Sequence, residues 1–297
     1  MFPIIPANSV AEEAGNDEGI FGFGTPGPTA VTNLVSNAGV VATDTAGVGT
    51  AREYVAACEY GGDKGIFGFG GGAYTAITNL VSNAGVVATD TAGVGTARGY
   101  LAACSYGEDK GIFGFGHDDS DQSMTNLVSN AGVVATDTAG VGTAVRQLAA
   151  CEYGGDKAIF GFGYASAGGY TARTNLVSNA GVVASDTAGV GTARDKPAAC
   201  GYGEDKGIFG FGVNGNYVSI TNLVSNAGVV ATDTAGVGTA RKYLAATQYG
   251  TDKGIFGFGN TPSQTAVTNL ASNAGVVATD TAGVGTARNG LAACSFN

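Results

Sequence analysis

One short acidic stretch holds the side chains best suited to chemistry. It begins at His117, the single histidine of the chain, and continues through Asp118, Asp119 and Asp121. A histidine that acts as a general base is normally oriented by a second group, and no such partner is evident in the local sequence. Three carboxylates could bind calcium, but the stretch lacks the glycine and the distal glutamate of an EF-hand loop. We expect a solvated loop, and a bound ion is the alternative.

Five cysteines recur at one position of an internal repeat, and Thr247 takes that position in one further copy. None of them shows the Cys-x-x-Cys spacing of a redox or zinc motif. A small buried side chain is the simplest interpretation, because a free cysteine packs like a small hydrophobic residue. A disulfide or a metal site stays open if neighbouring strands bring these residues together. The five are Cys58, Cys104, Cys151, Cys200 and Cys294.

An aspartate and an arginine also recur, as in Asp90 and Arg98. Six equivalent active sites in one chain are not expected, whereas charged pairs that fix the register between repeats are common. We therefore expect a structural role. In one copy Asp137 is retained but the arginine moves one place later, to Arg146. The other pairs are Asp44 and Arg52, Asp186 and Arg194, Asp233 and Arg241, and Asp280 and Arg288.

The stretch GIFGFG is rich enough in glycine to suggest a loop that cradles phosphate. It occurs at Gly19, Gly65, Gly111, Gly207 and Gly254, with AIFGFG at Ala158. A dinucleotide site needs one such loop followed by a helix, and no helical periodicity follows any copy. In a strand, Phe67 and Phe69 would share one face, and Gly68 would lie on the other. We expect these glycines to leave room for the phenylalanines of a neighbouring repeat.

The composition predicts an all-β protein without affinity for nucleic acid. Of 297 residues, 52 are glycine, 44% are hydrophobic and only 13% are charged. Strong helix formers are scarce, while Gly, Thr, Val, Ala, Phe and Tyr dominate. The net charge is −10, and no cluster of Lys or Arg could contact phosphates.

The first 18 residues differ from the rest of the chain. The opening MFPIIPANSVAEEAG lacks the basic start and the long apolar run of a signal peptide, and no later segment is apolar enough to span a bilayer. We expect a soluble chain without membrane insertion. Residues 1–18 are expected to form an arm outside the repeats, which occupy residues 19–297.

The repeats are 46 to 49 residues apart, a spacing typical of solenoids and propellers. In the second copy, YVAACEY, GIFGFG, TNLVSN and VVATDT read as four short strands separated by turn signals. Six copies of four strands predict a six-bladed β-propeller of four-stranded antiparallel blades. The first copy lacks a leading strand, and the chain ends in an orphan LAACSFN. Pairing of Leu291–Phe296 with Gly19–Gly24 would close the ring.

TAREYVAACEYGGDKGIFGFG, from Thr50 to Gly70, resembles the kelch repeat. The resemblance implies a galactose-oxidase-like propeller over residues 19–297. Some propellers of this type are copper oxidases, but their copper site needs two histidines, and the chain has only His117. We therefore expect no cofactor and no bound metal. The segment TNLVSNAGVVATDTAGVGTAR is also similar to kelch-like arrays in structural or fibre proteins of marine bacteriophages. This second resemblance implies a virion as the location.

The copies differ at two places. All length variation follows GFG, and a second variable pair of residues follows TAR. In an up-and-down blade both places lie at the same end, so both are expected on one face. Loops on a rigid scaffold commonly carry binding, although unconstrained drift is the alternative. The expected binding residues are Tyr54, Tyr74, Tyr100, His117, Asp119, Asp121, Tyr164, Tyr170, Tyr217 and Tyr243.

No convergent set of acid, base and metal ligand emerges, so we expect a non-enzymatic protein. The expected role is an assembly or attachment component, possessing a variable face that binds a protein partner. Residues 1–18 are the candidate docking element for other subunits. A lectin-like module that binds a glycan or a cell-surface receptor is the alternative, since tyrosine with Asn, Ser and Asp suits such surfaces.

Overall fold

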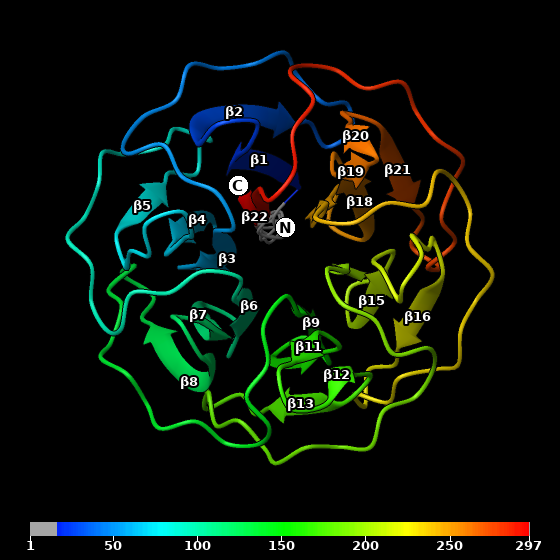
Figure 1. Cartoon of the computed structure of the whole chain (residues 1–297). Coiled ribbons are helices and arrows are strands. Elements are labelled where there is room, and N and C mark those ends of the chain that lie inside the picture. The colour runs from blue at the N-terminus through cyan, green and yellow to red at the C-terminus, as the bar shows by residue number, and fades with distance from the viewer. Residues whose placement is uncertain (1–16, 297) are drawn as a thin grey trace, which may run out of the picture.

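A computed structural model describes residues 17–296, and all regular elements in that range are β-strands (Figure 1). Most of the expected N-terminal arm, residues 1–16, lies outside the described residues. Within the described range no helix occurs, and hence none that is long and apolar enough to cross a membrane.

Each copy of the repeat forms one three-stranded antiparallel sheet whose central strand contains at least the first four residues of the GIFGFG stretch. The central strands are β1 (Glu18–Gly24), β4 (Lys64–Gly68), β7 (Lys110–His117), β10 (Lys157–Gly161), β15 (Lys206–Gly210) and β18 (Lys253–Gly257). On one side lie the strands that we call inner: β22 (Ala292–Phe296), β3 (Ala56–Tyr60), β6 (Ala102–Tyr106), β9 (Ala149–Tyr153), β14 (Ala198–Tyr202) and β17 (Ala245–Tyr249).

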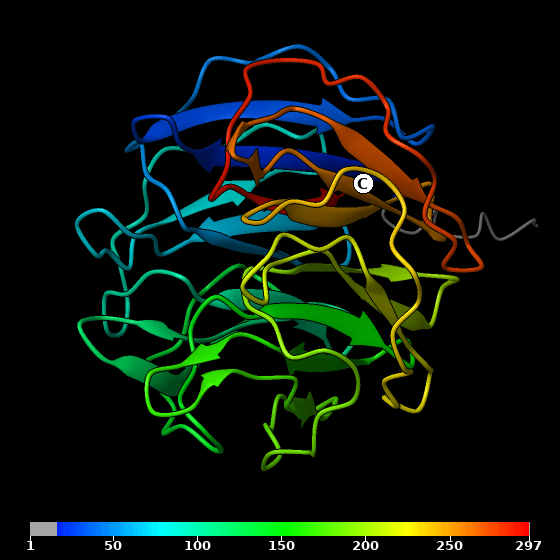
Figure 2. The same ribbon diagram turned by 45° about the vertical axis from the view of Figure 1, so that its right-hand side comes forward.

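On the other side lie β2 (Thr29–Val35), β5 (Thr78–Val81), β8 (Asp121–Val128), β13 (Thr174–Val177), β16 (Thr221–Val224) and β21 (Thr268–Ala271). Two loops add small hairpins, β11 (Tyr164–Ala165) with β12 (Gly169–Tyr170), and β19 (Asn260–Thr261) with β20 (Ser263–Gln264). Figure 1 shows the sheets placed around a common centre, with the labelled inner strands nearest to it. The long segments that connect the copies pass around the outside, as Figure 2 also shows.

The last strand of the described chain belongs to the first sheet. β22 pairs antiparallel with β1, so that Ile20 lies opposite Cys294 and Phe21 opposite Ala293. The pairing joins LAACSF to the one GIFGFG stretch that has no such strand before it. The C-terminal strand therefore takes the inner position that β3, β6, β9, β14 and β17 take in the other copies.

The expected fourth strand is not a regular strand. Residues 86–91 meet β5 only at two isolated bridges, Val81 with Val87 and Thr78 with Thr91, which differ in register by one residue. The side-chain amide of Asn79 donates to the carbonyl of Ala88 at 3.0 Å and takes the place of a backbone donor. This irregularity interrupts the ladder, so each sheet has three strands rather than four.

Contacts between neighbouring sheets rest on glycine and phenylalanine. A Cβ at Gly68 would lie 2.8 Å from Cζ of Phe113 in the next copy, so only glycine leaves room for that ring. The rings of Phe69 and Phe113 lie 5.1 Å apart, and Phe67 lies 5.1 Å from Phe23 of the preceding copy. The expected glycine–phenylalanine packing is therefore present between adjacent sheets.

The expectation that Phe67 and Phe69 share one face is wrong. Phe67 contacts the preceding copy and Phe69 the following copy. Phe69 has a φ of 61°, which ends the regular alternation of the strand and turns its side chain to the opposite face. Both rings are fully buried, and each sheet is therefore held on both of its faces by a phenylalanine.

Candidate functional site

The two variable parts of the repeat lie side by side. Single antiparallel bridges join the residue after TA-Arg to the residue after GFG, as for Glu53 with Gly71 and Gly99 with His117. Both segments therefore belong to one surface, which we call the variable face. The equivalent bridges are Thr25 with Asn289, Arg146 with Tyr164, Asp195 with Val213 and Lys242 with Asn260.

At the centre of the variable face, backbone hydrogen bonds link the copies in a cycle. The N–H of Tyr100 donates to the carbonyl of Tyr54 at 3.2 Å, and the N–H of Tyr54 donates to Gly290 at 2.6 Å. The run continues through every copy and returns to its first residue. Its members, which we call the axial ring, are Tyr54, Tyr100, Gln147, Lys196, Tyr243 and Gly290.

All members of the axial ring have φ between 53° and 63°. A non-glycine residue in this left-handed region is strained, and it persists only where its surroundings fix it. The hydrogen-bonded cycle supplies that constraint. The five side chains of the ring line one small cavity at the centre of the variable face, together with Gly290.

Three tyrosines of the axial ring pack together. The ring of Tyr54 stacks on Tyr100 at 4.2 Å and meets Tyr243 at 5.2 Å. The amide of Gln147 donates to the hydroxyl of Tyr243 at 2.8 Å, and the ammonium of Lys196 lies 5.3 Å from the centre of the same ring. Burial, more than the neighbouring charges, raises the pKa of each tyrosine. The hydroxyls therefore stay neutral at physiological pH and can donate hydrogen bonds.

The acidic stretch forms a second group, which we call the loop cluster. His117 Nδ1 lies 3.2 Å from Asp121 Oδ1, and the guanidinium of Arg146 binds the same carboxylate. The backbone N–H of Ser166 donates to the other oxygen of Asp121 at 2.7 Å. The His117 side chain is only 21% exposed, and its ring meets Tyr74 at 6.1 Å. The expectation of a solvated histidine without an orienting partner is therefore wrong, because Asp121 sits against it.

The loop cluster depends on the displaced arginine. Val145 takes the buried position that arginine holds in the other copies, and Arg146 instead turns toward the variable face. Its guanidinium lies 5.0 Å from the centre of the Tyr164 ring and donates to the Ser166 hydroxyl at 2.9 Å. Burial acts to raise the pKa of Asp121, but the bonds from Ser166 and Arg146 outweigh it and hold the pKa below 3.8.

The remaining candidate residues lie around these two groups. Tyr164 meets Tyr170 edge-on at 5.7 Å in the β11–β12 hairpin, and Tyr170 is 39% exposed. The Tyr217 hydroxyl donates to Asn260 at 3.3 Å, between two neighbouring loops. Asp119 is exposed in the acidic loop. The variable face thus holds an aromatic centre and several polar groups around it.

The expected binding residues do not include Gln147, Lys196 and Ser166, although the variable pair after TAR covers Lys196. Gln147 and Lys196 occupy the same repeat position as Tyr54, which is a signal that alignment of the copies would have given. Ser166 lies in the longest of the variable loops, and nothing in its local sequence distinguishes it from its neighbours.

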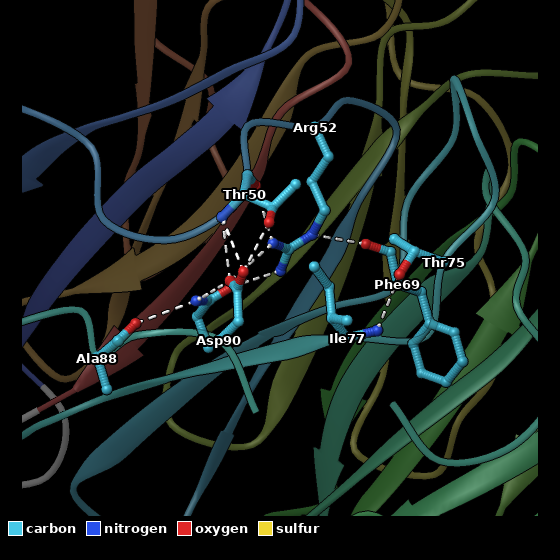
Figure 3. A network of polar contacts seen from close by, with 8 residues as sticks. Thr50, Arg52, Phe69, Thr75, Ile77, Ala88 and Asp90 are labelled. Carbon is cyan, nitrogen blue, oxygen red and sulfur yellow. Dashed lines mark hydrogen bonds and ion pairs between the residues drawn. The ribbon is translucent and has the colours of Figure 1, made fainter. Parts of the chain in front are cut away.

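The recurring arginine is buried between two sheets, as Figure 3 shows for Arg52. Its guanidinium donates to the carbonyl of Phe69 at 2.8 Å and to Asn79 Oδ1 at 2.6 Å, and lies over the ring of Phe23. Burial lowers its pKa to about 10, and the charge of Asp90 opposes that change. The arginine stays charged at neutral pH and holds two copies together.

The expected pairing of Asp90 with Arg98 is wrong. Asp90 lies 3.8 Å from Arg52, and Arg98 lies 3.9 Å from Asp137 of the next copy. The carboxylate of Asp90 also accepts from the N–H of Thr50 at 3.0 Å and from its hydroxyl at 2.6 Å. Each aspartate therefore binds the segment that leads into its own copy, and we call this contact the aspartate clamp. Asp44 binds Thr286, near the end of the chain, in the same way.

The five cysteines are buried and free. A Cβ at Gly111 would lie 2.5 Å from Cys58 Sγ, so this sulfur packs against the next sheet. Burial raises the pKa of the Cys200 thiol to about 12. Among residues 17–296, no three His, Cys, Asp or Glu side chains form a group that could hold a metal ion.

No protein-family model matches the chain, and a search among curated proteins finds no match. The function therefore has to be inferred from the geometry of the variable face.

Proposed function

We propose that the chain is a six-bladed, kelch-like β-propeller that acts as a non-catalytic recognition and assembly module. Six similar sheets, the pairing of β22 with β1 and the cyclic hydrogen bonds of the axial ring support this architecture. Phe258 and Phe21 form the same contact between the last and first copies that Phe69 and Phe113 form elsewhere.

One observation carries the functional proposal: the loops that differ in length between copies and the variable residues that follow the recurring arginine lie on one surface, while most contacts between sheets repeat. A repeated scaffold needs no difference between its loops, whereas a recognition surface does. The axial tyrosines provide flat apolar area, and the loop cluster adds a histidine, a guanidinium and a carboxylate. This combination suits a protein surface or a glycan.

The small size of the cavity at the axial ring favours a surface ligand over an enclosed small molecule. The space beneath the axial tyrosines is about 80 Å³, well below the volume of a pocket for a drug-sized ligand. A partner would therefore lie across the tyrosines rather than enter between them. The attachment role and a virion as context follow from the resemblance to phage arrays, with residues 1–18 as the docking arm.

The binding experiment compares three versions of the purified chain on a glycan array and on bacterial surfaces. The first is the full chain, the second has every loop after GFG replaced by TPGPTAV, and the third lacks residues 1–16. Binding by the first and third versions that the second loses would support recognition by the variable face. Binding that all three retain would contradict it.

The enzyme alternative can be tested separately, because His117 with Asp121 is the pair most like a catalytic dyad. We expect no turnover in a hydrolase screen with ester, glycoside and phosphate substrates. Turnover that His117→Gln abolishes would overturn the non-catalytic proposal.

A further inference from the structure

The sequence contains two Asn-Gly dipeptides, and the fold places them in contrasting surroundings. They are Asn214 with Gly215 and Asn289 with Gly290. An asparagine side chain can be attacked by the backbone nitrogen of the next residue, which closes an imide ring. Glycine favours this reaction, because it has no side chain to block the approach and its backbone adopts conformations that other residues avoid. The surroundings of the two glycines therefore decide which pair can react.

The first pair lies at the tip of a short hairpin on the variable face. Val213 and Tyr217 form an antiparallel bridge below the tip, and the N–H of Asn214 donates to the carbonyl of Asn216 at 3.1 Å. Gly215 is exposed, has a φ of 99°, and would have no neighbour within 4 Å of an added Cβ. No residue among 17–296 holds its N–H in a hydrogen bond. The nitrogen of this glycine is therefore accessible to the preceding side chain.

The side chain of Asn214 is turned along the same backbone. The N–H of Asn216 donates to Asn214 Oδ1 through a long hydrogen bond of 3.4 Å. A donor at this oxygen stabilises the negative charge that develops on it when the side-chain carbon is attacked. The hairpin tip thus holds an accessible nucleophile and a carbonyl with a donor already directed at its oxygen.

The second pair has the same two residue types but belongs to a fixed part of the molecule. Asn289 is 6% exposed, and its N–H and carbonyl are both bonded to Thr25. The N–H of Gly290 donates to the carbonyl of Tyr243 at 2.9 Å, within the axial ring. A nitrogen held in this way can attack only after the ring opens locally, and such opening of buried structure costs free energy.

We propose that Asn214 is a site of spontaneous deamidation on the variable face, whereas the fold protects Asn289. A base in solution removes the proton of the Gly215 N–H, the nitrogen bonds to Asn214 Cγ, and the side-chain amide leaves as ammonia. Water then adds to either carbonyl of the imide and opens the ring to aspartate or to isoaspartate. One water is consumed, one ammonia is released, and a neutral amide becomes a carboxylate.

The new carboxylate arises beside candidate binding groups. The hairpin is closed by Tyr217, whose ring centre lies 5.3 Å from Nζ of Lys242. Opening toward isoaspartate also moves one methylene from the side chain into the backbone at the hairpin tip. Deamidation therefore changes the charge and the backbone of one variable loop, and it leaves the repeated contacts between sheets intact.

The test is incubation of the purified full chain in mildly alkaline buffer, followed by tryptic peptide mapping with tandem mass spectrometry. One tryptic fragment carries both Asn214 and Asn226, and a second begins with Asn289. Asn226 is exposed but precedes alanine, so it controls for exposure without glycine, and Asn289 controls for glycine without exposure. We expect conversion at Asn214 to be at least about tenfold faster than at either control, with isoaspartate among its products.

A second incubation in denaturant separates the effect of the fold from that of the dipeptide. Unfolding should bring the rates at Asn214 and Asn289 together, because both precede glycine. Gly215→Ala should slow conversion at Asn214 in denaturant too, where correct folding of the variant plays no part. Equal rates at Asn214 and Asn289 in the folded chain, conversion at Asn226 as fast as at Asn214, or a product without isoaspartate would overturn the proposal. So would a folded chain that keeps Asn214 intact while the unfolded chain converts it.

Discussion

Two junctions between neighbouring sheets differ in whether they contain the recurring buried arginine. Between the second and third copies, Arg98 lies over Phe69 and donates to the carbonyl of Phe115 at 2.7 Å and to Asn126 at 2.8 Å. Between the third and fourth copies, Val145 replaces that arginine and leaves a cavity of about 10 Å³. Both junctions still form, so the arginine is not required for the contact between the sheets.

The comparison shows how the recurring arginine, buried between sheets in the other copies, comes to lie on the variable face in the fourth copy. With Val145 in the buried place, the arginine one position later joins the loop cluster through Asp121. Arg173 meanwhile approaches Asp186 to 4.0 Å from outside and bonds the Thr143 hydroxyl at 3.1 Å. Moving the arginine by one residue therefore adds a cation to the variable face. Asp186 still has a cationic neighbour, because Arg173 takes the place of the missing arginine.

The largest effect is expected from breaking the arginine junction. Arg98→Ala leaves the Phe115 carbonyl and Asn126 without their donor, at a cost of about 3 to 5 kcal/mol in the free energy of unfolding. Val145→Ala removes only two methyl groups from the other junction and should cost less. Denaturant unfolding measures both. Equal losses would mean that the buried arginine contributes little beyond packing.

Both junctions contain the contact of glycine with phenylalanine, and replacing the glycine by alanine would overpack it. A Cβ would lie 2.8 Å from a phenylalanine ring at Gly68 and equally at Gly114. Each alanine variant should lose about 1 to 3 kcal/mol of stability. Gly168→Ala is the control, because an added Cβ there has no neighbour within 4 Å. A clearly smaller loss for Gly114→Ala would show that the junction without arginine yields more easily.

The two junctions should differ in how much their aspartate clamps stabilise the chain, and this difference should depend on pH. Burial acts to raise the pKa of Asp137 and of Asp186, but hydrogen bonds from threonine and asparagine outweigh it and lower both. Their stabilisation is thus fully present above the pKa that aspartate has in the unfolded chain, and it is lost as pH falls through the lower pKa of the folded chain.

Melting temperatures measured from pH 7 to pH 2.5 test this clamp effect. Asp137→Asn should melt below Asp186→Asn at pH 7, because Asp137 faces the buried Arg98 whereas Asp186 has only the half-exposed Arg173. The difference should disappear in acid, where both carboxylates are protonated. A difference that persists at pH 2.5 would assign the effect to packing.

The smallest change in stability is expected from restoring the arginine with Val145→Arg. The carbonyl of Phe162 and the side chains of Asn175 and Asp186 stand ready as partners, so stability should shift by no more than about 1 kcal/mol, as for most buried ion pairs replaced by apolar groups. Denaturant unfolding measures the shift. A larger loss would mean that the junction has repacked around valine.

Much of the fold follows from local patterns, and most corrections follow from backbone geometry. Glycine content and turn signals indicated short strands, and the incomplete first and last copies indicated the pairing of β22 with β1. The opposite orientations of Phe67 and Phe69 could not be predicted, because alternation fails where φ becomes positive. The expected fourth strand is irregular because the side-chain amide of Asn79 binds the carbonyl of Ala88, and strand propensity takes no account of such a side-chain hydrogen bond.

Many residues of the candidate site could be predicted from the sequence, but the contacts between them could not. Alignment of the copies identified the tyrosines of the axial ring and the acidic loop. The meeting of His117, Asp121 and Arg146 depends on which sheets are neighbours and on how far each loop reaches. Such distances arise only from the assembled sheets.

The pairing of β22 with β1 also decides how the molecule responds to mechanical force. Glu18 and Phe296 are paired at one end of this antiparallel ladder, so the first and last described residues lie close to each other. Tension applied through Asp17 and Phe296 therefore loads the hydrogen bonds one after another, as in a zipper, rather than all together in shear. A protein tethered by both termini would open at this seam before any other sheet is strained, whereas one held by its loops would resist.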